Sequence, residues 1–405
     1  MMQKYKTLIV LKIYPYVKVL KDWYDKLFNS QWYNLISDLH SKFQLIKVIT
    51  PATWVKCQLP EVYQVQRSCY ADYYMNELAV YNIHNAVFSY GSDFILIGND
   101  CVWEKSQRST FSAENPADYP LLLHKENKVL LRKFRKEVFV PGTVISLVGV
   151  FSDVWAHFVV MYLPKLYYAG ESGLLDGDIT LITPHYKDAH LKEMVDEYLL
   201  KYPNVRRVEA GHHCNYRCES LLYIPTLCVL ADASDYILPF MGIFTPLVGG
   251  LLRKNLIDCL KIKANEIFED DFCSSKIFIT RRYSFYRSIL NGKELEELFV
   301  SKGFTVVDPG KMSLLEKIKV FSHADVIAGP LSGGFINTMF CKEKAKVLGF
   351  STIPRTAETF LPFIQLLSGI DLLLVTGFDL DRTTQPNYIV PMNRVEEALN
   401  HLLSK

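Results

Sequence analysis

Two short segments of the C-terminal half combine residue types that suit a diphosphate. Arg281 directly follows a short apolar run, and Arg287 lies a few residues further on. A second apolar run leads into the turn that holds Ser332, Gly333 and Gly334. Guanidinium groups bind phosphate oxygens in pairs, and glycines let backbone amides approach an anion at a helix N-terminus. The pattern therefore predicts an anion site between arginines and a helix end, against the simpler interpretation of a tight turn and surface arginines.

The N-terminal half offers a candidate for proton transfer. Asp153 and His157 come just after an apolar run that ends at Val150. An imidazole ordinarily has a pKa near neutrality, so a histidine at the end of a strand can act as a general base. The alternatives are a histidine that is only packed or exposed, or Asp153 as the base.

A cluster of potential metal ligands lies at His212, His213, Cys214 and Cys218. Zinc binds imidazole and thiolate groups, but structural zinc sites usually pair two short motifs, and the sequence has no second one. We therefore expect a turn with buried thiols and no metal site. The nine cysteines are an odd number in a long chain, which favours free thiols over a disulfide framework.

Composition narrows the classes of function. The 405 residues carry 45 Lys+Arg against 43 Asp+Glu, a formal net charge of +2, and 49% of them are hydrophobic. Disorder would need low hydrophobicity and high net charge, and a dedicated nucleic-acid binder would need a basic excess. Neither Leu8–Leu11 nor any other apolar stretch has the length of a signal peptide or a membrane span. We therefore expect a cytoplasmic protein without a nucleic-acid partner.

One basic segment, 125–136, leaves two interpretations open. It can be a solvated face, or it can contact an anionic membrane or a lipid-linked substrate. Membrane association of a cytoplasmic protein thus stays an open alternative.

The elements that would carry these residues alternate between strand and helix. Turn residues between short apolar segments in 85–103 predict a small antiparallel sheet. Beyond Pro141 the pattern predicts strands at 144–150, 178–183 and 205–208, with helices at 154–169 and 188–201. Strands that alternate with helices form parallel sheets with crossover helices.

The C-terminal half repeats this alternation. Strands are predicted at 276–280, 304–307, 325–328 and 346–350. Asn291 and Glu294 resemble a capping box at a helix start, Ser313 and Glu316 form another, and 335–340 is predicted to be a helix. Two such halves in series predict two Rossmann-like domains that face each other across a cleft.

The order of these motifs, over about residues 85–375, resembles that of family 61 glycosyltransferases. ITRRYSFYRSILNGKELEELFVSKGF and MSLLEKIKVFSHADVIAGPLSGGFINTMF are similar to the family's signature region of two arginines, an asparagine before an acidic helix, and a Gly-rich turn. FSDVWAHFVVMYLPKL is similar to its Asn-Tyr-x-His segment followed by Leu-Pro-Arg-Leu. ESLLYIP is similar to a further family segment.

The resemblance implies a GT-B fold and an inverting transferase that uses a nucleotide sugar. The family's two arginines match Arg281 and Arg287, its asparagine matches Asn291, and its histidine matches His157. The implied base is His157, with Asp153 as the alternative. The implied donor-binding residues are Arg281, Arg287, Ser332, Gly333, Gly334 and Asn337.

The chain departs from the family pattern at three places. The family usually has His-Gly-Ala before the glycine of its turn, where this chain has Leu331 and Ser332 followed by Gly333. Val154 stands at an asparagine position, and Met161 stands where an aspartate is frequent. We expect Ser332 or Asp153 to replace the polar contact that these changes remove.

We expect an α/β protein of GT-B type with an N-terminal β-rich extension. The expected division is 1–140 for the β-rich region packed on the first domain, 141–255 for the acceptor domain, 256–380 for the donor domain, and 381–405 for a C-terminal helix returning to the N-terminal domain. The implied partners are a nucleotide sugar, UDP-linked, and a glycan or glycolipid acceptor in cell-surface, capsule or viral glycan synthesis. Arginines and a helix end can carry the charge of the leaving group, so no metal or further cofactor is expected.

Other functions compete with this interpretation. Asp176-Gly-Asp178 and Asp379-Leu-Asp381 would suit a metal-dependent GT-A transferase, although the first pair precedes a strand and looks like a turn. The departures from the family pattern would suit a degenerate, non-catalytic nucleotide or sugar binder. A dinucleotide-dependent dehydrogenase is disfavoured, because no G-x-G-x-x-G follows a first strand.

Overall fold

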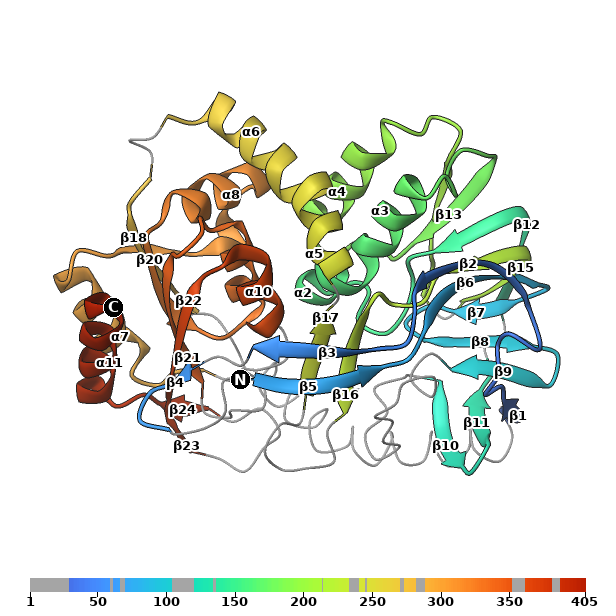
Figure 1. The fold of residues 1–405 in the computed structure, drawn as a ribbon, viewed down its shortest axis with the longest axis horizontal. Coiled ribbons are helices and arrows are strands. Elements are labelled where there is room, and N and C mark those ends of the chain that lie inside the picture. Colours follow the sequence, from blue (N-terminus) through green and yellow to red (C-terminus); the bar gives the residue numbers. More distant parts are fainter. Residues whose placement is uncertain are drawn as a thin grey trace, which may run out of the picture.

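The structure is a computed structural model of the chain. It describes residues 29–58, 61–65, 70–103, 120–133, 136–212, 214–232, 240–244, 246–269, 273–281, 288–351, 361–380 and 387–405. Arg287, His213 and Asp381 lie outside these residues. Figure 1 shows two α/β halves side by side, with the N-terminal strands next to the first half and the C-terminal helix on the second.

The first half is built on four parallel strands. They lie in the order β15 (Cys214–Tyr223), β12 (Lys136–Ser146), β13 (Ile179–Thr183) and β14 (Arg206–Glu209). The crossover from β12 to β13 is one continuous helical stretch, made of α2 (Trp155–His157), the π-helical turn η2 (Phe158–Tyr162) and α3 (Leu163–Glu171). The crossover from β13 to β14 is α4 (Ala189–Leu199). The alternation predicted for this half is therefore confirmed.

The strand expected at 144–150 is the C-terminal part of β12, which begins before residue 144 and ends before residue 150. β12 starts at Lys136 and stops at Ser146. The Ser146 hydroxyl accepts a hydrogen bond from Val148 N at 3.1 Å, which turns the chain out of the sheet. Residues 147–154 then form the connection to α2, and the candidate Asp153 lies on it.

Strands that pair mostly antiparallel to one another extend this sheet on its other side. β15 pairs with β6 (Leu78–His84) and β7 (Val87–Ser89), and the sheet continues through β8 (Phe94–Ile97), β9 (Asp100–Trp103), β1 (Ser30–Leu35), β11 (Lys128–Arg132) and β10 (Leu121–Lys125). β2 (Gln44–Thr50) pairs with β6. The antiparallel sheet predicted over 85–103 is confirmed, and it is continuous with the parallel strands in one mixed sheet.

The second half has a fully parallel sheet. Its strands lie in the order β19 (Thr305–Val307), β18 (Lys276–Ile279), β20 (Val326–Pro330), β21 (Lys346–Ser351), β22 (Asp371–Thr376) and β4 (Glu61–Val62). Its helical segments are α7 (Gly292–Ser301), α8 (Leu314–His323), the 3₁₀ segment η6 (Gly333–Phe340), α10 (Leu361–Ser368) and α11 (Met392–Ser404). The N-terminal region thus supplies the edge strand β4 to the C-terminal sheet.

Alternate residues of each strand face opposite layers of helices. On β22, Leu372 and Leu374 belong to the apolar cluster that holds residues of α8, η6 and α10. Leu373 and Val375 belong to the cluster that holds residues of α7 and α11. The C-terminal helix therefore packs on β21 and β22, where the sequence had led us to expect a return to the N-terminal domain.

The two expected capping boxes have different outcomes. At the start of α8, Glu316 N donates to the Ser313 hydroxyl at 3.3 Å and Ser313 N donates to the Glu316 carboxylate at 2.7 Å, which confirms that capping box. At the start of α7, the Asn291 side chain makes no cap. Its amide instead donates to Val390 O at 2.8 Å and accepts from Val390 N at 3.1 Å, so the expected box is wrong and Asn291 ties α7 to a distant segment.

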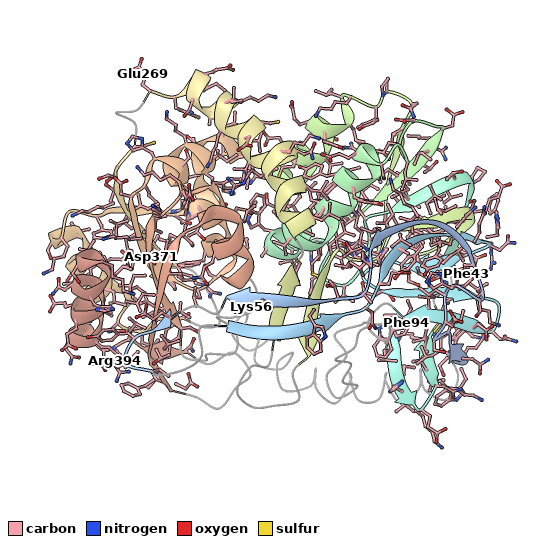
Figure 2. All side chains as sticks on the ribbon, in the orientation of Figure 1. Phe43, Lys56, Phe94, Glu269, Asp371 and Arg394 are labelled. Carbon is pink, nitrogen blue, oxygen red and sulfur yellow. The ribbon has the colours of Figure 1, made fainter. Side chains whose placement is uncertain are left out.

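One apolar cluster joins the two halves. It runs from Ile145 and Leu166 in the first half to Ile327 and Phe340 in the second, and Figure 2 shows side chains packed throughout the space between helices and sheets. The connection between the halves includes β16 (Cys228–Asp232), β17 (Phe240–Phe244), α5 (Pro246–Leu252), η3 (Arg253–Ile257) and α6 (Asp258–Ile267). The β3 (Thr53–Gln58) and β5 (Tyr70–Met75) hairpin contacts β17 and α10 through β3. The α/β class and the β-rich N-terminal region are confirmed.

None of the helices in the described ranges has both the length and the apolar character needed to cross a membrane.

We expect Gly329→Ala to destabilise the fold by about 1–3 kcal/mol, because overpacking in a tight core costs that much. A Cβ at Gly329 on β20 would lie 2.8 Å from both the Cβ and the carbonyl oxygen of Ile279 on β18. Chemical denaturation measures the change. Gly333→Ala, at the start of η6 just after β20, is the control, since a Cβ there has no atom within 4 Å. Equal stability of the two variants would contradict the close approach of β18 and β20.

Candidate functional site

The strand order of the C-terminal sheet fixes where a ligand can bind. Apart from the edge strand β4, β18 is the first strand of this sheet along the chain, and it lies between the next two, β19 and β20. The connections that leave β18 and β20 run to opposite faces, because α7 and η6 belong to different apolar clusters. In open parallel sheets, ligands bind beyond the carboxyl ends of the strands at such a switch point.

The residues beyond these two strand ends are those that the sequence singled out. β18 leads into Thr280 and the half-buried Arg281, and β20 leads into the turn that holds Ser332. The Thr280 hydroxyl donates to the buried carboxylate of Glu296 on α7, which anchors the chain just before Arg281. The close contact between Gly329 and Ile279 holds the two strand ends together. Arg281 and the glycine turn therefore lie at neighbouring strand ends, as predicted.

The glycine turn opens η6 with little side chain around it. Ser332 has extended backbone, and its side chain does not cap the helix. A Cβ at Gly334 would lie 3.6 Å from the Ser332 hydroxyl and 3.9 Å from Cγ2 of Ile279, so the start of η6 lies over the end of β18. Backbone amides at such a helix start are suitable donors to an anion.

Asn337 lies inside η6 and leaves one atom unsatisfied. Its side chain is 1% exposed, and its amide donates to Gly334 O at 2.8 Å. Its Oδ1 is buried without a hydrogen-bond partner among the residues that the structure describes. A buried acceptor without a donor is costly, so this oxygen is a candidate for a contact that forms only with a ligand.

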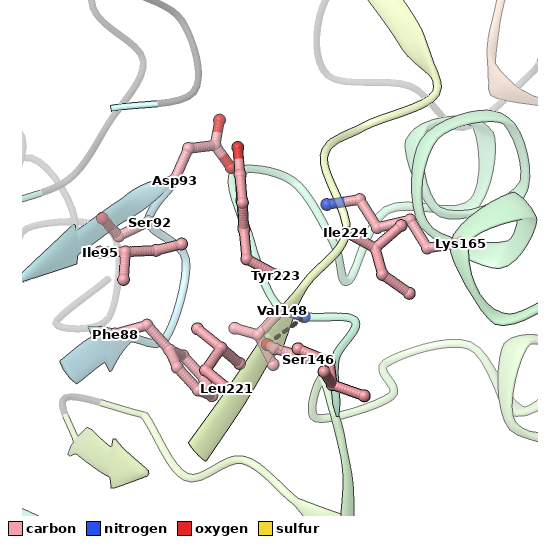
Figure 3. Close-up of a pocket in the computed structure, with 11 residues that line it drawn as sticks. Phe88, Ser92, Asp93, Ile95, Ser146, Val148, Lys165, Leu221, Tyr223 and Ile224 are labelled. Carbon is pink, nitrogen blue, oxygen red and sulfur yellow. Dashed lines mark hydrogen bonds between the residues drawn. The ribbon is translucent and has the colours of Figure 1, made fainter. Parts of the chain in front are cut away.

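The first half has a switch point of its own. β12 comes first along the chain and lies between β13 and β15, the strand that comes last. Figure 3 shows the pocket at the carboxyl ends of β12 and β15, lined by Ser146, Val148, Tyr223 and Lys165 among others. Lys165 is only 5% exposed, and its amine points toward Tyr223 and Asp93 in this view.

Sequence reasoning missed Lys165 and Asp93 as candidates. Lys165 stands in the LPKL segment at the position of an arginine in the family pattern, and that match was the one available signal. Asp93 comes from the loop between β7 and β8, and it accepts from Val150 N at 3.0 Å. The Tyr162 hydroxyl donates to Val150 O at 2.6 Å. Asp93 and Tyr162 therefore fix the connection that carries Asp153 and leads into α2.

His157 is held in a largely apolar position. Its ring centre lies 4.9 Å from that of Phe151, and its Nδ1 lies 3.5 Å from the sulfur of Met161. Burial lowers the pKa of His157 to about 4, although the nearby charge of Asp153 opposes the shift. The imidazole is therefore neutral near pH 7, which is the form that can accept a proton.

Asp153 is the second candidate for the base, and it already has a cationic partner. Its carboxylate forms an ion pair with Lys187, and its side chain is 15% exposed. On its other side lies Tyr90, and burial together with the charge of Asp153 raises the pKa of that phenol. Lys187 therefore already occupies the Asp153 carboxylate.

The two groups of candidate residues lie on elements that touch each other. α2, which carries His157, packs against η6, which begins in the glycine turn. The structure therefore places His157 on one of two touching elements, and Ser332, Gly333, Gly334 and Asn337 at the start of or within the other. Asp153 lies on the connection before α2, and Arg281 follows the neighbouring strand β18. Arg287 lies outside the described residues.

The expected absence of a zinc cluster was a prediction from sequence. In the described part of the chain, no three side chains of the His, Cys, Asp and Glu types are arranged to hold a metal ion. Cys214 and Cys218 lie buried in β15, and burial raises the pKa of the Cys218 thiol to about 12. The His212 ring packs edge-on to Tyr90, with ring centres 4.5 Å apart.

Parallel sheets with polar groups at both switch points define an α/β protein whose second sheet carries a candidate anion site. Residues 155–348 match the family model of Glycosyltransferase 61. This segment of the chain, which holds α2, β15, Arg281 and the glycine turn, belongs to that family, as the sequence motifs had indicated. Membership of a glycosyltransferase family supports sugar transfer as the general activity. A comparison with curated proteins gave no match.

We expect the buried His157 to make the folded state sensitive to acid. The ordinary pKa of histidine is about 6.5. Between that value and the folded pKa of about 4, the unfolded chain takes up a proton at His157 and the folded chain does not. Stability should therefore fall as the pH falls through this window. His157→Gln should flatten the fall in melting temperature between pH 7 and pH 4.5.

The matched control for this measurement is His40→Gln, because His40 is an exposed histidine paired with Glu77. It should keep the wild-type acid sensitivity. A His157→Gln variant that loses stability with pH as steeply as the wild type would show that His157 is not the buried neutral group described above.

Proposed function

We propose that the protein is an inverting glycosyltransferase of GT-B type that moves a sugar from a UDP-linked donor to a hydroxyl group of a glycan or glycolipid. The single observation that supports this most strongly is the contact between α2 and η6. This contact supports the proposal because α2 carries the neutral imidazole of His157 and η6 opens in the proposed anion site. Inverting sugar transfer needs two such groups: one that accepts the proton of the acceptor hydroxyl, and one that stabilises the leaving diphosphate.

The donor half of the proposal rests on the carboxyl ends of β18 and β20. Arg281 and the amides of Ser332 to Gly334 would hold the diphosphate, and Oδ1 of Asn337 would accept a hydrogen bond from the nucleotide sugar. The negative charge that develops on the leaving diphosphate would be stabilised by groups already in position. Since these groups carry that charge, we propose that transfer needs no divalent metal.

The chemical step balances with the residues at hand. The acceptor oxygen bonds to the anomeric carbon while the bond from that carbon to the diphosphate oxygen breaks on the opposite face. The hydroxyl proton goes to the imidazole of His157, and the nucleoside diphosphate leaves with the electron pair. A base works best with a pKa near the working pH, so the low pKa of His157 makes it a weak base at neutral pH.

The acceptor half of the proposal rests on the pocket of Figure 3. A buried ammonium, a tyrosine and a carboxylate line it, and these groups can bind sugar hydroxyls. We propose synthesis of a cell-surface, capsule or viral glycan on the cytoplasmic side. The lysines of β10 and β11, Lys125 and Lys128, are exposed and would face an anionic membrane or a lipid-linked acceptor.

A second candidate function is a nucleotide or sugar binder that does not transfer. Two observations favour it. Burial lowers the pKa of His157 to about 4, and the Asp153 carboxylate is already engaged in an ion pair with Lys187. One measurement distinguishes a transferase from a binder. UDP binding in calorimetry without UDP release from any of a panel of UDP-sugars would favour the binder.

We expect Arg281→Ala to weaken UDP binding tenfold or more and to abolish turnover, because a hydrogen bond to a charged group is worth about 1.5–3 kcal/mol and 1.4 kcal/mol is tenfold. Arg281→Lys should recover only part, because an ammonium cannot bind two oxygens in the guanidinium geometry. Calorimetry with UDP and an assay of UDP release from UDP-sugars measure both effects.

The control is Arg217→Ala, because Arg217 is a partly exposed arginine of β15 in the first sheet, where it pairs with Glu137 of the neighbouring strand β12. It should bind UDP as the wild type does. Unchanged UDP affinity in Arg281→Ala, with the melting temperature also unchanged, would remove Arg281 from the donor site.

A further inference from the structure

A buried lysine of the second half reaches into the first half beside the candidate base. Lys317 lies on α8 and is 4% exposed. Its amine lies 2.9 Å from Nδ1 of His190 on α4 and 5.0 Å from the ring centre of Trp155 on α2. α8 connects two strands of the C-terminal sheet, whereas α2 and α4 lie in connections between strands of the N-terminal sheet. Lys317 therefore contacts two elements across the junction.

The groups around the amine favour a cation. Asp188 Oδ1 lies 2.9 Å from the same imidazole nitrogen of His190, and Asp188 also caps α4 through His190 N. Burial lowers the pKa of Lys317, while the charges of Asp188 and Glu193 oppose that shift. Both carboxylates come from the N-terminal half. An ammonium in an apolar core is tolerated when it has such partners, and aromatic faces attract it.

The position of Trp155 gives this contact its importance. Trp155 begins α2, in the same turn as His157. Its ring packs edge-on to His190, with the ring centres 6.2 Å apart, and Lys317 lies over its face. α8 also packs against η6, the segment that starts in the glycine turn. One helix thus supports both the element with the candidate base and the element with the anion site.

We propose that Lys317 is a positioning residue, which holds α2 and its His157 in register with the donor site by clamping Trp155 and His190 from α8. This inference rests on the proposed function for its catalytic meaning. Lys317 does not touch the reacting atoms in this assignment. It acts through Trp155 on the distance between base and anion site.

A positioning role predicts a particular pattern of rates. Displacement of a base by about 1 Å can cost as much as about a hundredfold in rate, while the binding of the leaving group at a separate point is not affected. Lys317→Met keeps the length of the side chain and removes its charge. It should lower kcat for UDP release from UDP-glucose, UDP-galactose, UDP-xylose or UDP-N-acetylglucosamine by about tenfold to a hundredfold. Its affinity for UDP should equal that of the wild type.

The chain offers a matched control on the same helix. Lys319 is also a buried lysine of α8, 3% exposed, but its amine donates to Asn265 of α6 at 3.0 Å. Lys319→Met should lower the melting temperature as Lys317→Met does and should leave kcat unchanged. Lys317→Arg keeps the charge and can stack on Trp155, so it should restore most of the lost rate. A general loss of stability would not lower kcat in Lys317→Met while leaving kcat unchanged in Lys319→Met.

A second readout does not depend on turnover. The emission of Trp155 is obtained as the difference between the wild type and Trp155→Phe. Acrylamide should quench this emission more strongly in Lys317→Met than in the wild type, with no increase in Lys319→Met. Should Lys317→Met fail to fold, His190→Leu removes the same contact from the other side and should give the same increase.

The outcomes separate the two proposals. Wild-type protein that binds UDP but releases it from no donor would overturn the proposed transfer, and the quenching measurement would then decide the role of Lys317 alone. Unchanged quenching in both Lys317→Met and His190→Leu would overturn the positioning role. Loss of kcat in Lys319→Met as large as in Lys317→Met would overturn it as well.

Discussion

The packing of α2 against η6 is the constraint on which the rest of the candidate site depends. α2 carries His157 and belongs to the first sheet, whereas η6 opens in the glycine turn and belongs to the second. A single apolar cluster joins the helices of both halves. Since protein interiors are close-packed, a shift of one of these helices is felt by the other. The relation between the proposed base His157 and the proposed anion site is therefore set by the packed core.

Local sequence patterns were sufficient for most elements of the two parallel sheets. The strands predicted at 276–280 and 325–328 agree closely with β18 and β20, because buried parallel strands are short apolar runs with clear ends. Pairings between distant segments could not be predicted in this way. β4 joins β22 from the far N-terminal region, α11 packs on the second sheet, and Asn291 binds Val390 in place of its own helix. These contacts depend on tertiary packing, which no local pattern contains.

The candidate site likewise has parts that local sequence patterns could predict and parts that depend on tertiary packing. Arg281 and the glycine turn could be predicted together, because each directly follows a strand and the carboxyl ends of parallel strands share one edge. His157 could be predicted as a residue, but its lowered pKa could not, since Phe151 and Met161 bury it only in the fold. Buried lysines were missed for a related reason. In sequence, Lys317 stands in a helix with charged neighbours and cannot be told from a surface residue.

The placement of cations in this protein shows why a formal net charge of +2 carries little information about its ligands. A charge in a low-dielectric interior acts on its neighbours far more strongly than one in water. Lys317 is such a buried charge, and its amine lies 5.0 Å from the ring centre of Trp155 and 2.9 Å from Nδ1 of His190. Its burial is tolerable only because partners from the other half compensate for lost hydration. The same interaction that keeps this ammonium in the core thus also fixes the two halves relative to each other, so stability and alignment of the site have one cause.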